Sequence, residues 1–418
     1  MVLKIWVTFI ILTVWNPSAV ANQSHDVFIA ASPDSSPNII RHNLYSKNLQ
    51  EERVIDVSLP VNYAETAENV RYPVFVVMDG ELLFSGVSGV VEMMSMNSQM
   101  PESIVVGIYN TPDGRRNMMP RSIDKNGKRH RYGGKENQYL AFIQDEVLPM
   151  IDKNYRSASF RTMIGLSPSA KLTLHSFWKA PELFNAHVAI GASDFMAEGY
   201  EGESVFYKIE QVVAKTKDFK GWLYISAAPY NAAEILKKYK GLAKNLTPYI
   251  GNKVILKTEI VNKNGYAMAL PSILTAIETI FPSKRWDVSY REFFSEKPGQ
   301  TLKNVKNHFD ALSKEYGFTA LPKGERFYNR NRLKRLGYQL LAQERFSEAI
   351  AMFKYWKELY PSSANAYDSL ADAYEANEQF DIALKARKKA VQLAKKNKDI
   401  RLSVFESTLK KHEIQAEG

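Results

Sequence analysis

The most informative segment of the sequence is Phe160-Arg161-Thr162-Met163-Ile164-Gly165-Leu166-Ser167-Pro168-Ser169-Ala170-Lys171. The apolar residues up to Ile164 predict a strand, Gly165 permits a sharp turn, and the residues after the turn are typical of a helix. Ser167 is therefore expected at the apex of a strand–turn–helix. This arrangement resembles the G-x-S-x-G nucleophile elbow, except that Ser169 replaces the last glycine.

Short apolar runs alternate with longer helical patterns on both sides of this segment. Such alternation predicts a mainly parallel α/β sheet covered by helices on both faces, with ligands at the carboxyl ends of the strands. The expected strands are Val54–Leu59, Val74–Met78, Ile104–Ile108, Thr162–Ile164, Ala186–Ile190, Trp222–Ala227 and Val254–Val261. The expected helices are Gln138–Ile151, Ala170–Trp178, Glu203–Lys215, Ala232–Lys244 and Pro271–Ile280.

Further motifs follow one another in a characteristic order. They are Tyr72-Pro73-Val74, Met78-Asp79-Gly80-Glu81, Val105-Val106-Gly107-Ile108 followed by Arg116 and Pro120, Gly133-Gly134, Phe142-Ile143, Glu146-Val147-Leu148-Pro149 and Leu270-Pro271. Together with the turn at Ser167, they resemble the esterase family that includes enterochelin-type siderophore esterases, in particular exported members with C-terminal tetratricopeptide repeats. The resemblance covers most of the chain. It implies an α/β-hydrolase fold with a serine nucleophile, a histidine base and an acidic partner.

Two of these three catalytic residues have no counterpart in the sequence. The family places its histidine shortly before the last hydrolase helix, where this chain has Tyr266 or Gly265, depending on the alignment. No histidine occurs from position 188 to position 305. The acid normally follows the strand expected at Trp222–Ala227, but no carboxylate precedes Glu234 in that loop. The resemblance therefore implies a degenerate catalytic site.

Pro168 also changes the turn itself. The backbone N–H after the nucleophile normally helps to form the oxyanion hole, and proline has no N–H. Losing one such donor typically costs about 3–4 kcal/mol of transition-state stabilisation. Proline also favours an extended backbone at Ser167, which disfavours a strained apex. Ser167 is then either an ordinary helix N-cap before a first-turn proline or a residual nucleophile with a base recruited from elsewhere.

The loop from Arg115 to Lys135 contains the other candidate site residues. His130 is the best candidate for a recruited base, because in the family this segment precedes a Gly-Gly segment that lines the site. His175 and His187 are expected to be structural. The loop is strongly basic, and Arg116, Arg129 and Arg131 are candidate ligands for an anionic group such as a catecholate, a phosphate or a lipid headgroup. A solvated loop without a ligand is the alternative.

Beyond about Pro282 the strand signal stops and a helical repeat begins. Residues match at a spacing of 34 positions, as in the pairs Leu333/Tyr367, Leu336/Leu370, Gly337/Ala371, Leu340/Tyr374, Phe346/Phe380 and Ala349/Ala383. This period and these residue types predict two tetratricopeptide-type repeats, with Trp356 and Arg387 as departures from the pattern. Two repeats are too few for a free-standing solenoid. We expect them to stack on a helix at Leu302–Tyr316 or on the hydrolase domain, as a buttress or as a binding groove for a protein partner.

The N-terminus has the pattern of a secretory signal peptide. Lys4 precedes an apolar run from Ile5 to Trp15, and Ser18-Ala19-Val20-Ala21 provides a cleavage site. The run is shorter than the roughly 20 residues that a membrane span needs. We therefore expect an exported chain, periplasmic or secreted, without a stable membrane span; an uncleaved anchor is the alternative.

The composition fits this picture. The chain of 418 residues is 45% hydrophobic, has a net charge of +10 and contains no cysteine. Disulfides and thiolate metal sites are excluded, and no metal site or cofactor is expected. The positive charge suggests anionic ligands or surfaces, whereas export argues against a nucleic-acid partner.

We expect five segments: a signal peptide (1–21), an esterase-like α/β-hydrolase domain (22–285), a helical connector (286–325), two repeats (326–400) and a polar tail (401–418). Three functions are compatible with them. The first is a catalytically degenerate esterase-family protein that binds a small ester, an anionic ligand or a partner. The second is an active serine ester hydrolase that uses Ser167 with a non-standard base. The third is a repeat scaffold for protein partners, with the hydrolase fold as a support.

Overall fold

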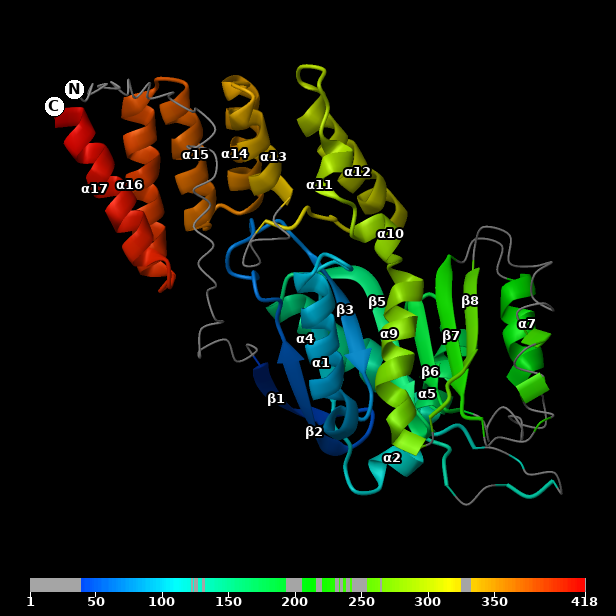
Figure 1. Cartoon of the computed structure of the whole chain (residues 1–418). Helices are drawn as coiled ribbons and strands as arrows, with labels where there is room; N and C mark the ends of the chain where they lie inside the picture. Colours follow the sequence, from blue (N-terminus) through cyan, green and yellow to red (C-terminus); the bar gives the residue numbers. More distant parts are fainter. Residues whose placement is uncertain are drawn as a thin grey trace, which may run out of the picture.

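The computed structural model describes residues 39–417 except 122, 124–126, 130–131, 193–204, 216–219, 230–232, 234–235, 238–240, 243–253, 264 and 325–331. These residues form an eight-stranded sheet followed by a row of helices (Figure 1). The strand order is β1-β2-β4-β3-β5-β6-β7-β8. The pairs β1–β2 and β2–β4 are antiparallel, and the remaining pairs are parallel. The expectation of a mainly parallel sheet is confirmed.

All seven expected strands are present, and one further strand was not predicted. The strands are β1 (Ile39–Ser46), β2 (Glu51–Ser58), β3 (Tyr72–Val77), β4 (Ile104–Ile108), β5 (Ser157–Leu166), β6 (Ala186–Ile190), β7 (Gly221–Ala227) and β8 (Val254–Ile260). The inner strands β3, β4 and β6 are buried throughout, which explains their continuous apolar sequences. The missed strand, β1, is largely exposed at the edge of the sheet and lacks such a run.

Helices cover both faces of the sheet. Alternate residues of β3 point to opposite sides: Phe75 and Val77 pack with α1 (Gly80–Met96) and α9 (Ala269–Ile280), whereas Val74 and Val76 pack with the segment Glu136–Asn154. That segment consists of α3 (Glu136–Phe142), a π-helical turn η2 (Ile143–Val147) and α4 (Leu148–Asn154), where one helix was predicted. The helices α5 (Pro168–Lys179) and α7 (Val205–Lys215) cover the other strands on this second face. The predicted helix Ala232–Lys244 lies mostly outside the described residues.

The C-terminal part of the chain is helical, as expected. Its elements are α10 (Ser283–Trp286), α11 (Tyr290–Phe293), α12 (Gln300–Tyr316), α13 (Arg332–Ala342), α14 (Phe346–Leu359), α15 (Ala364–Ala376), α16 (Phe380–Lys396) and α17 (Leu402–Glu417). The prediction of a polar tail after residue 400 was wrong, because α17 packs Phe405 against α16 and buries it. None of the helices in the described ranges is long and apolar enough to span a bilayer.

The expected repeat corresponds to two helix pairs, α13–α14 and α15–α16. Gly337 has no room for a side chain, because a Cβ atom there would lie 2.2 Å from Cε1 of Phe353. In the second pair, Arg387 replaces the aromatic residue and is nearly buried. Its guanidinium binds three carboxylates of α15, those of Asp368, Asp372 and Glu375. The departure from the pattern is thus matched by acidic residues on the facing helix, while the tetratricopeptide assignment itself stays a prediction.

The helical region is fixed to the sheet domain near the amino end of β3. The backbone N–H of Ala67 donates to the carbonyl of Leu359 at 3.0 Å, and the backbone N–H of Ser362 donates to the carbonyl of Glu65 at 3.4 Å. Side chains of α12 share one hydrophobic core with α13 and α14. The repeats therefore stack both on the helix before them and on the sheet domain, at the end of the strands opposite to Ser167 (Figure 1).

Candidate functional site

Ser167 stands between β5 and α5 in a strained conformation. Its backbone angles are φ 58° and ψ −107°, and its side chain does not cap α5. An ordinary N-cap has an extended backbone and a side chain that bonds to the first turn. Ser167 thus stands at the N-cap position as predicted but without the ordinary capping geometry, and the expectation that Pro168 would remove the strained apex was wrong. Pro168 does occupy the first turn of α5, as predicted.

Gly165 is what allows the turn to close. A Cβ atom on this glycine would lie 2.4 Å from the backbone oxygen of Ser169, so any other residue would push the first turn of α5 away from β5. The backbone N–H of Ser167 donates to the carbonyl of Ile190 at the end of β6, at 2.8 Å. The neighbouring strand thus holds the strained residue in place.

Ser169, in the place of the last glycine, has a buried side chain with a defined partner. Its hydroxyl donates to Oδ2 of Asp79 at 2.6 Å and accepts from the N–H of Leu166 at 2.7 Å. Asp79 follows β3, so this contact connects the ends of two adjacent parallel strands. The additional hydroxyl therefore fits the turn instead of disrupting it.

Asp79 is the centre of a buried polar network. It is fully buried, has a left-handed backbone (φ 55°, ψ 52°), and accepts hydrogen bonds from Nδ2 of Asn110 at 2.7 Å and Nε of Arg115 at 3.0 Å. Burial raises the pKa of Asp79, while the charge of Arg115 and the hydrogen bonds from Ser169, Arg115 and Asn110 act against this rise. The carboxylate thus serves as an anchor between three loops at the carboxyl edge of the sheet.

Arg115 brings a positive charge to the elbow. Besides Asp79, it contacts the carbonyl of Leu166 through Nη2 at 3.4 Å and the hydroxyl of Tyr266 through Nη1 at 3.2 Å. Its guanidinium carbon lies 5.7 Å from the centre of the Tyr266 ring. Burial tends to lower the pKa of Arg115, but Asp79 outweighs this effect and the pKa is raised. A guanidinium has more N–H donors than these three partners use, so donors remain for an anionic ligand.

Tyr266, which the sequence comparison put in the place of the family's histidine, does lie at this site. It belongs to η3 (Gly265–Met268), directly before α9, and it is 60% exposed. The position expected for a base is therefore occupied by a phenol that accepts a hydrogen bond from Arg115.

Each histidine in the described ranges has its contacts elsewhere. His42 bonds Tyr155, His175 bonds Asn137, His187 lies between the rings of Phe177 and Phe184, His308 bonds the carbonyl of Arg285, and His412 contacts Glu375. Burial lowers the pKa of both His175 and His187 to about 3. As expected from the sequence, these two residues are structural.

The candidates in the basic loop have different outcomes. His130 and Arg131 lie outside the described residues. Arg116 binds the loop itself: Nη1 donates to the hydroxyl of Tyr132 at 3.2 Å, and the guanidinium lies 4.7 Å from the ring centre. Arg129 is exposed and pairs with Ile123 through a backbone bridge. The arginine that reaches the elbow is Arg115, the neighbour of the predicted Arg116.

Comparison with known proteins supports an esterase-like fold for the sheet domain. Residues 46–196 match the family model "Esterase", described as "Putative esterase". An IroE-like serine hydrolase from Shewanella oneidensis has 19% sequence identity and a TM-score of 0.58, over 77% of this chain and 98% of that one. The sheet and its helices therefore fit the α/β-hydrolase fold, and part of this domain matches the esterase family model. Its central residues Asp79, Arg115 and Ser167 fall inside the matched segment, whereas Tyr266 lies beyond it.

Other solved structures are similar over different shares of the chain. An uncharacterised protein from Capnocytophaga ochracea has 17% identity and a TM-score of 0.52, over 88% of this chain and 99% of that one. A siderophore hydrolase from Aspergillus nidulans has 17% identity and a TM-score of 0.48, over 62% of this chain and 99% of that one. No curated protein matches the sequence. At these identities the likeness concerns the fold, and the chemistry must be argued from the residues of this chain.

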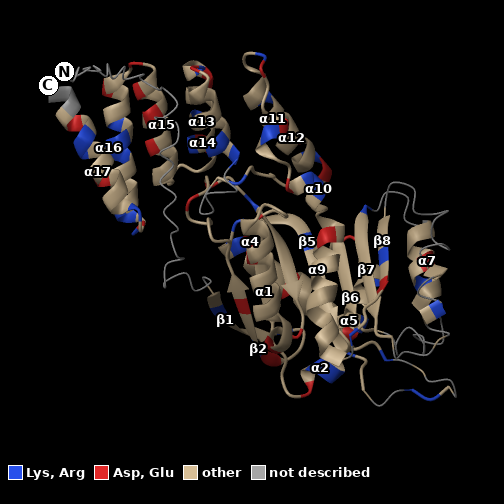
Figure 2. Cartoon of the chain, in the orientation of Figure 1, with Lys and Arg blue, Asp and Glu red and all other residues tan. Residues whose placement is uncertain are grey.

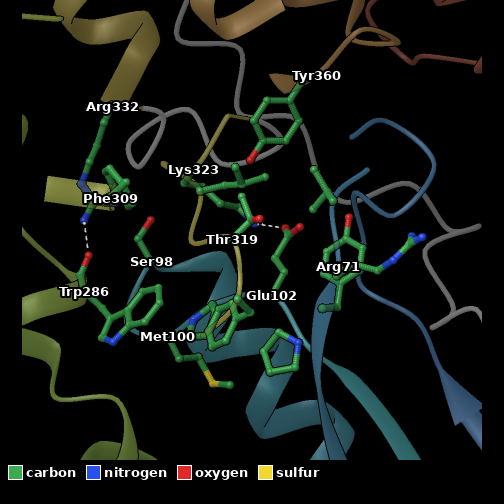
Figure 3. A pocket seen from close by; sticks show the side chains of 16 residues that line it. Arg71, Ser98, Met100, Glu102, Trp286, Phe309, Thr319, Lys323, Arg332 and Tyr360 are labelled. Atoms are coloured by element: carbon green, nitrogen blue, oxygen red, sulfur yellow. Dashed lines mark hydrogen bonds and ion pairs between the residues drawn. The ribbon is translucent and has the colours of Figure 1, made fainter. Parts of the chain in front are cut away.

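A separate recess lies between the sheet domain and the helices (Figure 3). It is at the amino ends of β3 and β4, away from Ser167, and its volume of about 40 Å³ suits a few water molecules. Its charged groups have partners: Lys323 pairs with Glu102, and Arg332 donates to the carbonyls of Trp286 and Val288. Ligands of parallel α/β sheets bind at the carboxyl ends of the strands, so this recess is a less suitable place for the main site.

Proposed function

We propose that the esterase-like domain binds an anionic ligand beside Ser167 without hydrolysing it by a serine–histidine mechanism. The observation that carries this proposal is the position of Arg115. Its guanidinium pairs with the buried Asp79 and contacts the carbonyl of Leu166 in the elbow. It also donates a hydrogen bond to Tyr266, which stands where the family has its catalytic histidine. A fixed guanidinium recognises carboxylates, phosphates and phenolates through charge-assisted hydrogen bonds.

The residues of the elbow support the same proposal, because they lack groups that hydrolysis needs. Pro168 supplies no N–H for an oxyanion, which leaves only the donors from the loop after β3. Removal of the base alone costs roughly 10⁶-fold in a serine hydrolase. No described side chain forms a hydrogen bond with the hydroxyl of Ser167. The hydroxyl of Ser167 can then form a hydrogen bond with a ligand, and the ligand is released without being hydrolysed.

Titration calorimetry tests this function with 2,3-dihydroxybenzoate and inorganic phosphate as probes. We expect binding of at least one probe to the native chain, with an affinity about tenfold lower or worse in Arg115→Met, since a charge-assisted contact is removed. Arg116→Met is the matched control, because its guanidinium binds Tyr132 instead of the elbow. Equal affinities of the two variants would contradict the proposal.

An active serine hydrolase is the second candidate, and one specific observation favours it. Ser167 keeps a strained backbone with φ 58°, and strained residues of this kind concentrate at functional sites. A fluorophosphonate probe distinguishes the two functions. Stoichiometric labelling of the native chain that disappears in Ser167→Ala establishes the hydrolase, whereas an unlabelled native chain supports ligand binding.

The proposal also covers the location of the protein and the role of the helix pairs α13–α14 and α15–α16. We expect the protein to act outside the cytoplasm, because residues 1–21, which lie outside the described residues, have the pattern of a signal peptide. Among the described residues, the helix pairs contact the sheet domain near the amino end of β3, opposite to Ser167. They act as a buttress or as a separate protein-binding surface.

A further inference from the structure

Large apolar side chains are exposed beside the elbow. Leu82 in the first turn of α1, Tyr266 in η3, and Leu270 and Leu274 at the start of α9 are between 38% and 60% exposed. The two helices are close at this end, since a Cβ atom on Gly86 would lie 3.0 Å from Cδ2 of Leu270. These side chains therefore belong to one surface, which we call the apolar edge. Exposed apolar patches of this kind mark interaction sites.

The helices of the apolar edge carry few charges and no positive ones. Within α1 and α9 the only charged residues are Glu81, Glu92 and Glu278. Both helices are accordingly almost uncoloured in Figure 2. The outward surface of α1 and α9 thus lacks the mixture of positive and negative charges that makes an ordinary protein surface soluble.

Basic residues lie on α2 (Gly114–Asn117), beside the apolar edge, and on the loop that follows α2. Figure 2 shows blue residues of α2 below the start of α9. Arg115 of α2 contacts Tyr266, so this loop begins next to the edge. The exposed basic residues are Arg116, Arg121, Lys128, Arg129 and Lys135. The exposed acids nearby are Asp113 and Glu81, and Glu81 accepts hydrogen bonds from Asn110.

We propose that the apolar edge and the basic loop dock onto the surface of a lipid bilayer that contains anionic headgroups. Apolar side chains inserted at the headgroup level and lysine or arginine residues beside them are the two contributions that bind proteins to such surfaces. A second copy of the chain fits less well, because a symmetric contact would place two basic loops beside each other. The bilayer satisfies both features at once.

Docking in this orientation would place the elbow at the membrane. The side chain of Arg115 contacts both Leu166 of the elbow and Tyr266 of the apolar edge, so it bridges the two regions. A ligand could then reach Arg115 from the lipid surface. The docking rests on other residues than the proposed function, since Leu270, Arg129 and Lys135, which the test changes, do not contact the elbow in the described structure, whereas Arg115 does.

Sedimentation with lipid vesicles tests the inference. The probes are vesicles of phosphatidylcholine alone and of phosphatidylcholine mixed with phosphatidylglycerol, and all variants are purified after export with the same N-terminus. The native chain should bind the anionic vesicles and be released by salt, because screening weakens charge attraction. Leu270→Asp, and separately the pair Arg129→Glu and Lys135→Glu, should each lower the bound fraction about fivefold or more.

Two matched controls are available on the far helices. Val404→Asp on α17 introduces the same charge at a position that is 44% exposed, and Lys396→Glu on α16 reverses an exposed charge. Both should bind as the native chain does, and circular dichroism checks that every variant is folded. The inference is overturned if the native chain does not bind, if it binds both lipids equally, or if the edge variants match the controls. It is also overturned if Leu270→Asp dissolves a dimer and vesicle binding is absent. Arg115→Met should lower the affinity for the calorimetric probes without abolishing vesicle binding, which separates this docking from the proposed function.

Discussion

The hydroxyl of Ser169 donates a 2.6 Å hydrogen bond to Asp79, a residue 90 positions earlier in the chain. The contact crosses from the start of α5 to the end of β3, and both side chains are fully buried. In the G-x-S-x-G motif, Ser169 counts only as a substitution of the last glycine. The structure makes it a partner of the one carboxylate that also holds Arg115.

Ser169→Ala should therefore destabilise the protein. It removes a hydrogen bond to a buried charged group, and such bonds contribute about 1.5–3 kcal/mol. Urea unfolding should show a loss of that size in the free energy of unfolding. Ser176→Ala is the matched control on the same helix, because the hydroxyl of Ser176 is buried without a partner in the described part of the chain. A loss in the control as large as in Ser169→Ala would contradict this account of Ser169.

Restoring two of the three missing catalytic features, the histidine and the N–H after Ser167, should produce esterase activity. We expect the double variant Pro168→Gly and Tyr266→His to hydrolyse p-nitrophenyl acetate faster than the native chain. The glycine regains the N–H for the oxyanion, which is typically worth about 10²–10³ in kcat. The histidine supplies a base where the family has one.

The control for this restored activity is the triple variant that also carries Ser167→Ala, which should be inactive. Hydrolysis that persists without Ser167 would come from another group. Hydrolysis by the native chain that depends on Ser167 would contradict the proposed function.

The hydrolase fold was predictable because its signals are local. Buried parallel strands such as Ile104–Ile108 and Ala186–Ile190 are short continuous apolar runs, and both were placed at their correct bounds. Elements without such signals were missed, among them β1 and α1. The edge strand β1 is mostly exposed, and α1 contains Gly86 and Gly89, which weaken a helical pattern.

The site was less predictable, because its contacts depend on strand order. Ser167 could be located from its turn, and Tyr266 from the resemblance. Asp79 and Arg115 are 36 positions apart and lie beside the turn of Ser167 because β4, β3 and β5 are neighbours in the sheet. The Asp-Gly pair after a strand was a visible signal, but nothing in the sequence linked it to Arg115. Nor could the strain at Ser167 be foreseen, since proline at the next position suggested the opposite.

Arg387 should be essential for the second helix pair. Its side chain is 4% exposed and pairs with Asp368, Asp372 and Glu375, so Arg387→Met would remove the cation that these three carboxylates share. Breaking a buried ion pair in this way costs about 3–5 kcal/mol. Hydrogen exchange should show faster opening of α15 to α17.

Lys388 provides the matched control for Arg387. Its ion pair with Glu413 is exposed on both sides, and such pairs contribute about 0–1 kcal/mol. Lys388→Met should therefore leave exchange in these helices nearly unchanged. Equal effects of the two variants would mean that the three carboxylates do not need Arg387.

His187 should make the protein sensitive to acid. Burial between Phe177 and Phe184 lowers its pKa from 6.5 to about 3. Between these two values the unfolded chain binds a proton that the folded chain does not. This contribution to stability is therefore fully present above pH 6.5 and is lost as the pH falls toward 3, by about 1.4 kcal/mol per pH unit.

His187→Phe should reduce this dependence of stability on pH, as measured by urea unfolding at pH 7 and pH 5. Phe184→Leu, a change at a neighbouring ring that cannot ionise, should lower stability equally at both pH values. If His187→Phe keeps the slope of the native chain, the acid sensitivity arises from other groups, His175 first among them because its pKa is lowered in the same way.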